Sequence, residues 1–494
     1  MAKKVLAIDF GASSGRAVVG TLENGRIVLE EIHRFSNDPV MLGDTMYWDV
    51  LRLFHEIKQS LIKSKGFGEI MSLGIDTWGV DFGLIDINGR LLENPVHYRD
   101  ARTKGMLEKA FELVPKESFY TVTGNQFMEI NTAFQLMAVA QKRPELLERA
   151  DKLLMMPNLF TFFLTGEKVT EQSIASTTQL YDQAGSCWAY KLAERLGIKQ
   201  SLFTNIVPAG AKIGSLTHEI REELGLGHMD VIAVCGHDTQ AAMAAVPSHE
   251  KDFAFLSCGT WSLLGTELDE PVLDENSLRL NVTNEVGYGG KTSFLKNIIG
   301  LWLIQESRRQ FRREGREYSF AQLESMAREA KPFQCYIDPD DESFVAAGNI
   351  PERIRRYCSE TGQYVPQSEG EVIRCIYESL ALKYRTAIAE LEACTGKKYD
   401  KLYMIGGGTK DKLLSQLTAS ACKITVSSGP VEATALGNIA VQLMASGDIK
   451  DISEAREIIA RSEEITLFKA ESPMQWDKAY EDYLRVTSNK IKEL

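Results

Sequence analysis

The feature that most constrains the fold is a pair of strand–turn–strand segments, at residues 5–20 and 253–265. In each segment an apolar run leads into glycine and hydroxyl residues, and a second apolar run follows. Small residues let backbone N–H groups close around an anion, and serine or threonine hydroxyls supply further donors. Two such turns in the two halves of one chain predict a duplicated α/β protein that holds a nucleotide in a cleft.

The bulk properties of the chain exclude several functions. Its 494 residues are enough for two or three domains with full hydrophobic cores. A net charge of −12 argues against a nucleic-acid surface or a polybasic membrane patch. The longest apolar runs are shorter than a membrane span requires. We therefore expect a cytoplasmic protein with small-molecule ligands and with neither a nucleic-acid nor a membrane partner.

The eight cysteines are scattered and show neither a CxxC motif nor Cys/His ligand spacing. Such a pattern does not predict a zinc site, and most of these thiols are expected to be reduced core residues. Cys358 and Cys375 are spaced to permit a bridge within one local unit, although a cytosolic setting disfavours a disulfide. Their redox state stays open at this point.

The order of predicted elements supports two similar halves. Residues 247–252 form the best junction, so we predict domains at residues 1–247 and 248–494. Each half is expected to follow the order β-β-β-α-β-α-β-α. Hydrophobic spacing and turn residues predict helices at 50–63, 294–313, 371–395 and 433–446, and strands at 27–35, 231–235 and 401–405.

Asp9 stands at the end of the first predicted strand, beside the first glycine turn. A carboxylate there can hold Mg²⁺, directly or through water, next to the phosphates that the turn binds. The alternative is an aspartate that only caps the turn. Ser13, Ser14 and Arg16 follow directly, and these residues favour the metal-binding interpretation.

Asp238 follows an apolar strand in the sequence Gly236-His237-Asp238-Thr239. Open α/β sheets bind ligands at the ends of their strands, where this carboxylate could accept a proton from a substrate hydroxyl. The competing interpretation is an N-cap for the helix that begins near Ala241. Position alone leaves both open.

Two further glycine-rich segments carry weaker signals. Residues 406–409 place three glycines and a threonine between a strand and a helix, which allows a phosphate or a flat ligand to approach the backbone. A simple tight turn is the alternative. Residues 285–292 nearly match a P-loop, but Glu285 stands where that motif needs glycine and would repel phosphate. We therefore predict a hairpin turn there.

Taken in order, these segments resemble the FGGY carbohydrate kinases along essentially the whole chain. A narrower likeness within the family is carried by long stretches, namely residues 9–16, 74–82, 258–263, 295–303 and 429–433. The usual threonine of the first turn is replaced by Ala12-Ser13, which narrows the resemblance to a subfamily without casting doubt on ATP binding.

The resemblance implies an α/β fold of two ribonuclease-H-like domains, as in actin and Hsp70, flanking a deep cleft for ATP and sugar. The N-terminal domain would bind the sugar and carry the first phosphate turn, and the C-terminal domain would bind ATP. The implied catalytic base is Asp238, and the implied metal-binding residue is Asp9. Implied ATP contacts are Ala12, Ser13, Ser14, Gly15, Arg16, Thr260, Gln305 and Gly407, and implied sugar contacts are Gly79, His237, Asp238, Thr239 and Asn297.

The expected activity is transfer of the ATP γ-phosphoryl group to the terminal hydroxyl of a ketose, with Mg²⁺ as the metal. Which ketose or polyol is the acceptor stays open, because a few pocket hydrogen bonds decide it. An actin/Hsp70-like ATPase switch acting on protein is the alternative outside the enzyme class, but no appended peptide-binding domain follows the second half. The expected assembly is a monomer or a small homo-oligomer.

Overall fold

A computed structural model of the chain describes residues 3–491. By contacts the chain divides into two units, each built from three segments. The first unit comprises Met1–His249, Glu267–Phe294 and Ala433–Glu463, and the second comprises Glu250–Thr266, Leu295–Glu432 and Glu464–Leu494. The domain boundary predicted between residues 247 and 248 stays a prediction, because these units are defined by contacts and not by a single cut.

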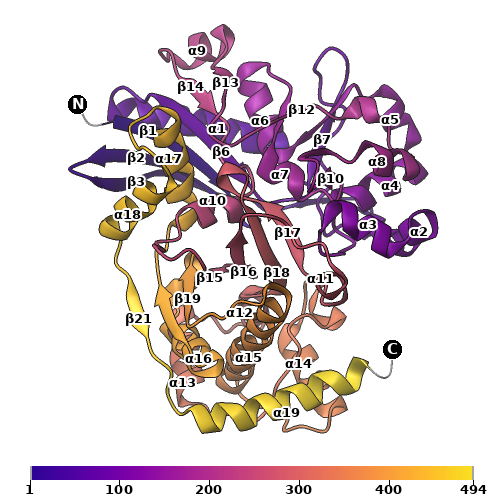
Figure 1. The fold of residues 1–494 in the computed structure, drawn as a ribbon, viewed down its shortest axis with the longest axis vertical. Helices are drawn as coiled ribbons and strands as arrows, with labels where there is room; N and C mark the ends of the chain where they lie inside the picture. Colours follow the sequence, from indigo (N-terminus) through magenta and orange to yellow (C-terminus); the bar gives the residue numbers. More distant parts are fainter. Residues whose placement is uncertain (1–2, 492–494) are drawn as a thin grey trace. The chain divides into compact units, whose positions relative to one another are not determined.

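The first unit is organised around a six-stranded sheet with the order β13-β14-β6-β1-β2-β3 (Figure 1). Its central strand β1 is apolar and buried on both faces over most of its length, as expected for a strand covered by helices on both sides. The strands are β1 (Lys3–Phe10), β2 (Ser14–Glu23), β3 (Arg26–Ser36), β6 (Ser72–Thr77), β13 (Lys212–Ser215) and β14 (Asp230–Ile232).

Small two-stranded ribbons surround this sheet. They pair β4 (Val40–Leu42) with β5 (Thr45–Tyr47), β7 (Phe82–Ile85) with β8 (Lys152–Met155), β9 (Val169–Glu171) with β12 (Asn205–Val207), and β10 (Tyr181–Asp182) with β11 (Cys187–Trp188). The helices of the unit are α1 (Val50–Ser64), α2 (Met106–Leu113), α3 (Lys116–Thr123), α4 (Thr132–Lys142), α5 (Pro144–Arg149), α6 (Met156–Thr165), α7 (Gln172–Ser176), α8 (Tyr190–Arg195), α9 (His218–Leu224), α10 (Asp238–Ala244), α11 (Glu275–Arg279), α17 (Ala433–Ala445) and α18 (Ile452–Ser462).

Two late helices of the chain belong to the first unit. Helix α17 packs on β1 and β6, and α18 packs on β3 (Figure 1). The approach of α17 to α10 requires Gly437, because a Cβ at this position would lie 1.7 Å from the carbonyl oxygen of Ala241. Residues more than 350 positions apart therefore share one core, and α17 brings polar side chains beneath the site described below.

The second unit contains a sheet with the order β17-β18-β16-β15-β19-β20-β21, whose first strand belongs by contacts to the first unit. Its strands are β15 (Ala254–Cys258), β16 (Trp261–Leu268), β17 (Thr283–Val286), β18 (Thr292–Ile299), β19 (Lys401–Ile405), β20 (Thr425–Ser428) and β21 (Thr466–Phe468). Its helices are α12 (Trp302–Arg313), α13 (Phe320–Glu329), α14 (Ile350–Glu360), α15 (Glu369–Thr395), α16 (Lys412–Cys422) and α19 (Pro473–Ile491).

The two sheets repeat one topology. In the first, β3-β2-β1-β6-β14 are neighbours, and in the second, β18-β16-β15-β19-β20 occupy the same relative positions. In the first sheet, β1 pairs antiparallel with β2 and parallel with β6, and β6 pairs parallel with β14. In the second sheet, β15 pairs antiparallel with β16 and parallel with β19, and β19 pairs parallel with β20. The two sheets therefore share the strand order expected of a duplicated chain, whereas the predicted order β-β-β-α-β-α-β-α is interrupted in the second half by α11 and β17 before β18.

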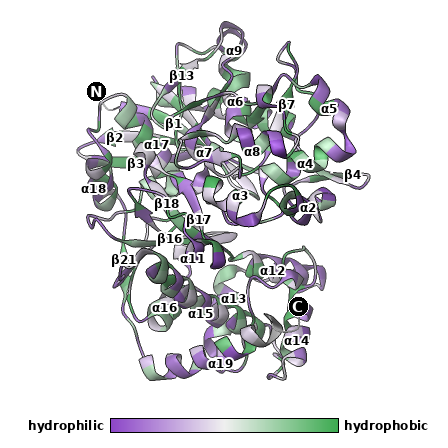
Figure 2. Ribbon diagram, turned by 45° about the vertical axis from the view of Figure 1, so that its right-hand side comes forward, coloured by the Kyte–Doolittle hydropathy of each residue, from purple (hydrophilic) through white to green (hydrophobic). Residues whose placement is uncertain are grey.

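Local signals explain most of the helix boundaries. Helix α1 begins after Asp49, whose side chain accepts a hydrogen bond from the N–H of Arg52. Helix α15 begins with a capping box between Ser368 and Glu371 and ends at Gly396, which has a φ of 68°. Figure 2 shows mainly hydrophobic residues in β1 and β2 and stretches of hydrophilic residues in surface helices such as α19.

One predicted helix was wrong in its first part. Residues 294–299 belong to β18, and helix α12 begins only at Trp302. The apolar residues of this stretch fit a buried strand as well as a helix, and Gly300 separates the two elements. A Cβ on Gly300 would lie 2.8 Å from the backbone nitrogen of Ser262, so the chain passes directly against β16 at this point. Within the described residues, no helix is both long and apolar enough to cross a membrane.

Candidate active site

Three neighbouring strands of the first unit end at the predicted site. Strands β1 and β6 run parallel, with Asp9 beside Asp76 in the register. The next parallel strand, β14, leads to a bridge between Thr77 and His237. The carboxyl ends of parallel strands are where open α/β sheets bind ligands. Three acidic residues, Asp9, Asp76 and Asp238, thus gather at one edge of the sheet.

Asp9 is buried and paired with Arg16. The two residues face each other across the antiparallel strands β1 and β2, and the guanidinium donates two hydrogen bonds to Oδ2 of Asp9, at 2.9 and 2.7 Å. The side chain of Asp9 is 9% exposed and that of Arg16 17% exposed. Both predicted residues therefore lie together at the mouth of the first turn, where the ion pair fixes their positions.

The first turn is held from behind by Asn37. The N–H of Gly11 donates to the carbonyl of Ser14 at 2.9 Å and closes the turn. The side chain of Asn37 donates to the carbonyl of Gly11 at 2.9 Å, and its backbone N–H donates to the carbonyl of Ser13 at 3.1 Å. Because Asn37 binds the carbonyls of Gly11 and Ser13, the turn can present backbone N–H groups to an anion. Sequence reasoning missed Asn37, which follows β3 without a recognisable motif.

Asp238 is the first residue of α10 and does not cap it. His237 is the N-cap residue and makes no side-chain capping bond, so the interpretation of Asp238 as an N-cap was wrong. The side chain of Asp238 is 29% exposed, and its Oδ1 accepts a hydrogen bond from the hydroxyl of Thr239 at 3.2 Å. Loss of hydration raises its pKa to about 6, with His237 acting to lower it and Asp9 to raise it.

His237 lies between two carboxylates. Its Nε2 is 3.5 Å from Oδ1 of Asp238, and its Nδ1 is 2.9 Å from Oε2 of Glu285. Burial acts to lower the pKa of His237, but the negative charges of Glu285 and Asp238 outweigh it and raise the pKa. Gln240 donates a hydrogen bond to the same Oε2 of Glu285 at 2.9 Å. The imidazole is therefore held in place beside Asp238.

Glu285 has a role that its sequence context concealed. The hairpin predicted at residues 285–292 is confirmed, because β17 and β18 are joined by a turn in which Gly287 donates to the carbonyl of Lys291 at 2.7 Å. The carboxylate that spoils the P-loop match is buried against His237. A carboxylate followed by glycines could only be recognised as a partner of His237 once the fold was known.

Asp76 is a fully buried carboxyl group that sequence reasoning did not single out. Its Oδ2 accepts a hydrogen bond from the amide of Asn438 on α17 at 2.6 Å. Burial, followed by the negative charge of Asp9, raises the pKa of Asp76 well above its usual range. It lies in the stretch 74–82 that carried the family resemblance, which is the one signal that pointed to it.

The remaining predicted residues of the first unit border His237. A Cβ on Gly79 would lie 3.4 Å from Nε2 of His237 and 3.3 Å from the side chain of Thr177, so a larger residue would fill the space beside the imidazole. Thr239 is 4% exposed and directed to Asp238. The structure thus brings Gly79, His237, Asp238 and Thr239 together.

The second turn lies in the second unit and, like the first, is closed by a glycine N–H and held by hydrogen bonds to its carbonyls. The N–H of Gly259 donates to the carbonyl of Trp261 at 2.9 Å. The carbonyl of Thr260 accepts from the N–H of Gly300 at 3.2 Å, and the N–H of Leu301 donates to the carbonyl of Gly259 at 3.0 Å. The hydroxyl of Thr260 donates to Oε1 of Gln305 at 3.2 Å, so this predicted pair is in contact.

The triple glycine lies beside this second turn. Strands β15 and β19 are parallel neighbours, with Ser257 opposite Ile405, and Gly406 follows with a φ of 88°. Gly408 packs so closely on Cys258 that a Cβ would clash with its sulfur, whereas a Cβ on Gly407 would meet open space. Asn297 lies half-buried on β18 of the same unit. The predicted residues are thus divided between the two units.

Comparisons with known proteins identify the family. The N-terminal domain model of the FGGY family of carbohydrate kinases matches residues 4–245, and the C-terminal domain model matches residues 254–446. The chain belongs to the FGGY family of carbohydrate kinases. It is therefore an enzyme that transfers phosphate to a sugar hydroxyl, and this membership supports ATP as the donor.

Curated relatives match nearly the full length. A rhamnulokinase from Bacteroides thetaiotaomicron is 41% identical, over 97% of this chain and 98% of the relative. A rhamnulokinase from Lactiplantibacillus plantarum is 38% identical over 100% of both chains. The predicted family and enzyme class are therefore confirmed. The subfamily resemblance is confirmed as a similarity to rhamnulokinases.

Solved structures confirm the fold. The ligand-bound xylulose kinase from Lactobacillus acidophilus matches with a TM-score of 0.79 and 17% identity, over 99% of this chain and 98% of that protein. The glycerol kinase from Plasmodium falciparum with ADP matches with a TM-score of 0.77 and 16% identity, over 100% of this chain and 98% of that protein. The two-domain kinase fold predicted from the sequence is correct.

Proposed function

We propose that the protein transfers the γ-phosphoryl group of Mg-ATP to the terminal hydroxyl of L-rhamnulose, forming L-rhamnulose 1-phosphate in rhamnose catabolism. The observation that carries the chemistry is Asp238, a half-buried carboxylate with a raised pKa, at the start of α10 and near Asp9 of the first phosphate turn. The choice of sugar rests on the curated rhamnulokinases, which match almost the full chain at 38–43% identity.

Asp238 is proposed as the general base. A carboxylate whose pKa is about 6 is ionised at neutral pH and is more basic than an ordinary aspartate. It would orient the terminal hydroxyl of the sugar and accept its proton as the new bond to phosphorus forms. Most of the rate enhancement in phosphoryl transfer comes from such positioning and from charge stabilisation.

His237 is proposed to position this base and to bind the sugar. Its contact with Glu285 orients the ring, and in its protonated form the ring would favour the ionised form of the base. Gly79 leaves space beside the ring for a substrate, and Thr239 adds a hydroxyl at the same place. Asn297 is proposed as a further sugar contact contributed by the second unit.

The two turns are proposed to bind the phosphates of ATP. In the first, Ala12, Ser13, Ser14, Gly15 and Arg16 would supply N–H groups, hydroxyls and one positive charge. In the second, Thr260 and Gln305 would supply polar contacts. The open space at Gly407 would let the nucleotide approach the backbone.

The residues at the first turn fit a magnesium ion. Asp9 and Asp76 are oxygen donors at neighbouring strand ends, and Asp238 is a third at the start of α10. Within residues 3–491 no hydrogen-bond donor reaches Oδ1 of buried Asp76. Among the described residues, the oxygens of these three carboxylates do not all lie close enough together to hold one ion. Mg²⁺ would therefore be held by Asp9, with one further carboxylate at most, and by phosphate oxygens. When bound, it neutralises charge on the phosphates.

Three alternatives remain to be tested. A kinase for L-fuculose or for xylulose would use the same base and turns with different pocket contacts. An actin/Hsp70-like ATPase switch would hydrolyse ATP slowly and independently of sugar.

The cytoplasmic location and the monomeric or small homo-oligomeric state are predictions that rest on the sequence.

The deciding measurement is ADP release with L-rhamnulose, L-fuculose, D-xylulose and glycerol at equal enzyme and Mg-ATP. We expect kcat/KM to be highest with L-rhamnulose, by about tenfold or more over the others, and phosphorus NMR to show a sugar 1-phosphate. A preference for another sugar would overturn the substrate while leaving the kinase intact. ADP release that no sugar stimulates would overturn the kinase proposal.

A further inference from the structure

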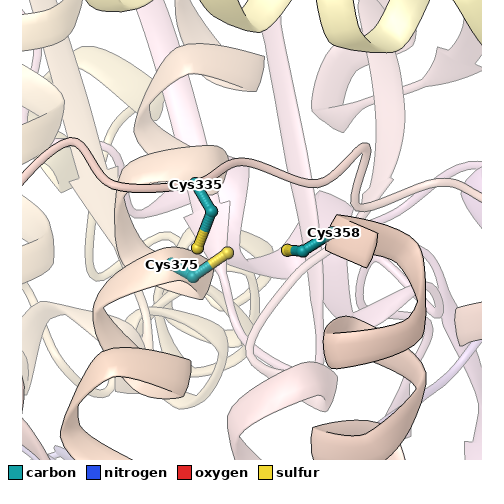
Figure 3. Close-up of side chains that lie close together, drawn as sticks. All are labelled: Cys335, Cys358 and Cys375. Carbon is teal, nitrogen blue, oxygen red and sulfur yellow. The ribbon is translucent and has the colours of Figure 1, made fainter. Parts of the chain in front are cut away.

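Three cysteines far apart in the sequence converge in the second unit. Cys335 lies in the loop after α13, Cys358 on α14 and Cys375 on α15 (Figure 3). Their sulfur atoms all lie within 4.8 Å of one another. The residues are 3%, 0% and 2% exposed, so the cluster is shielded from water. None of them belongs to the phosphate turns or to the proposed sugar site.

Hydrogen bonds fix two of the three backbones relative to each other. The side chain of Gln363 accepts from the N–H of Tyr336 at 2.8 Å and donates to its carbonyl at 2.9 Å. The backbone N–H of Gln363 donates to the carbonyl of Cys358 at 2.8 Å. One residue thereby ties the loop that carries Cys335 to the end of the helix that carries Cys358.

A second polar contact fixes the third cysteine. The hydroxyl of Ser379 donates to the carbonyl of Cys375 at 2.6 Å and accepts from the N–H of Ile337 at 3.0 Å. This bond ties the same loop to α15. The backbone segments that carry the three cysteines are therefore tied together by hydrogen bonds before any ion binds, as an ion-binding site requires.

The arrangement of the sulfurs is suited to a metal ion. A metal–sulfur bond of about 2.3 Å places the sulfurs of a three-thiolate site about 4 Å apart, in tetrahedral or trigonal geometry. The separations in the cluster fall within the range that such an ion could close with small shifts of side chains. All three cysteines are free thiols, so each sulfur is available as a ligand.

We propose that Cys335, Cys358 and Cys375 form a binding site for one soft d¹⁰ metal ion, Cu(I) or Zn(II). On binding, three S–H protons leave to solvent as three metal–sulfur bonds form, and the oxidation state of the metal does not change. Thiolates select these soft ions over Mg²⁺. Among the described residues the cluster contains no fourth histidine, cysteine or carboxylate, which favours Cu(I), because Zn(II) would need water as its fourth ligand.

The test uses the full-length protein, purified under reducing conditions and titrated with Cu(I) or Zn(II) against a competing chelator. We expect a single ion per chain, absorbance from thiolate-to-metal charge transfer, and a higher melting temperature in the presence of the ion. Cys335→Ser, Cys358→Ser and Cys375→Ser should each weaken binding at least about tenfold, since each removes a ligand. Binding of Cu(I) and Zn(II) is measured separately to distinguish the two ions.

Cys422→Ser is the matched control, because Cys422 is a partly buried thiol of the same unit outside the cluster. It should bind the ion as the unmodified chain does. Sugar kinase activity of each variant reports whether it has folded. Cadmium bound to the unmodified chain gives an independent measure of three sulfur ligands by ¹¹³Cd NMR. Absence of binding, unchanged binding in the three variants, or a mass two hydrogens lower from an oxidised pair would each overturn the proposal.

Discussion

The two glycine turns share a construction but differ in charge. Each is a tight connection between antiparallel strands, and in each the carbonyls accept hydrogen bonds from a neighbouring segment. At matched positions in the two hairpins, however, the first has Asp9 opposite Arg16, and the second has Ser257 opposite Leu263. The two hairpins therefore share their topology, but at these matched positions only the first hairpin has an ion pair.

The second turn also lacks a charge at Cys258, the buried thiol that directly precedes it. Burial raises the pKa of Cys258 to about 12, so this side chain is uncharged at neutral pH. Near the first turn, Asp9 and Asp76 lie at adjacent strand ends and Asp238 lies at the start of α10. This difference in charge supports the proposal that phosphoryl transfer takes place at the first unit. The second turn is suited to holding a nucleotide by hydrogen bonds.

The largest expected effect is that of Asp238→Asn. If the chemistry belongs to the first unit, removal of the base should lower kcat by roughly 10²–10⁴ while leaving the KM values for ATP and sugar within a few-fold. Steady-state kinetics measures this split. Asp230→Asn, at the start of β14, is the control for loss of a carboxylate and should keep normal turnover. Near-normal turnover of Asp238→Asn with both substrates bound would contradict the assignment.

The pH profile should show the same group. The base works when ionised, and its pKa is raised to about 6, so kcat/KM should be constant above that pH and fall by about tenfold per unit below it. The raised pKa means that the folded chain binds this proton more tightly than the unfolded chain, so its contribution favours folding as the pH falls through 6. In Asp238→Asn the inflection should disappear. An unchanged inflection in that variant would assign it to another group.

Gly300→Ala should disrupt the second turn. A Cβ would lie 2.8 Å from the backbone nitrogen of Ser262, so the hydrogen bonds that hold the carbonyl of Thr260 must shift. We expect a loss of about 1–3 kcal/mol in the free energy of unfolding and a raised KM for ATP. Gly259→Ala is the comparison for stability, because its Cβ would be 3.7 Å from the nearest atom. Equal stabilities by denaturant unfolding would contradict this account.

Asn37→Ala should have the smallest effect of the set. It removes the side-chain hydrogen bond to the carbonyl of Gly11 but leaves the backbone bond to Ser13. The expected cost is about 1 kcal/mol in stability, with a few-fold higher KM for ATP. Asn205→Ala, at an exposed position, should change neither quantity. An effect on kcat alone would show that Asn37 acts on the chemistry and not on the turn.

Local sequence signals predicted much of the fold because they act over short distances. The apolar run of β1 and the hydrophobic spacing of residues 50–63 each indicated an element from neighbouring residues alone. The cap at Asp49 and the capping box at Ser368 are local signals of the same kind, on which no prediction rested. The stretch 294–299 was predicted wrongly because its apolar residues suit both a strand and a helix. Only its position against β16 decides between them.

The site divides in the same way. Asp9 and Asp238 were visible because each follows an apolar strand and stands beside glycine, whereas Glu285 and Asn438 are polar residues of distant segments. Their partners, His237 and Asp76, are determined by how β17 and α17 return to the first unit. Spacing in the sequence carries no information on such contacts.

The sequence alone determined the two turns, the duplicated order of elements and the family, since these depend on local residue patterns. The tertiary structure decided that Asp9 and Arg16 pair across the first turn, that Asp238 is not a helix cap, and that three scattered cysteines share one buried cluster. The physical reason is that burial and long-range contacts set the hydration and charge of a side chain. Hydration and charge in turn set its chemistry.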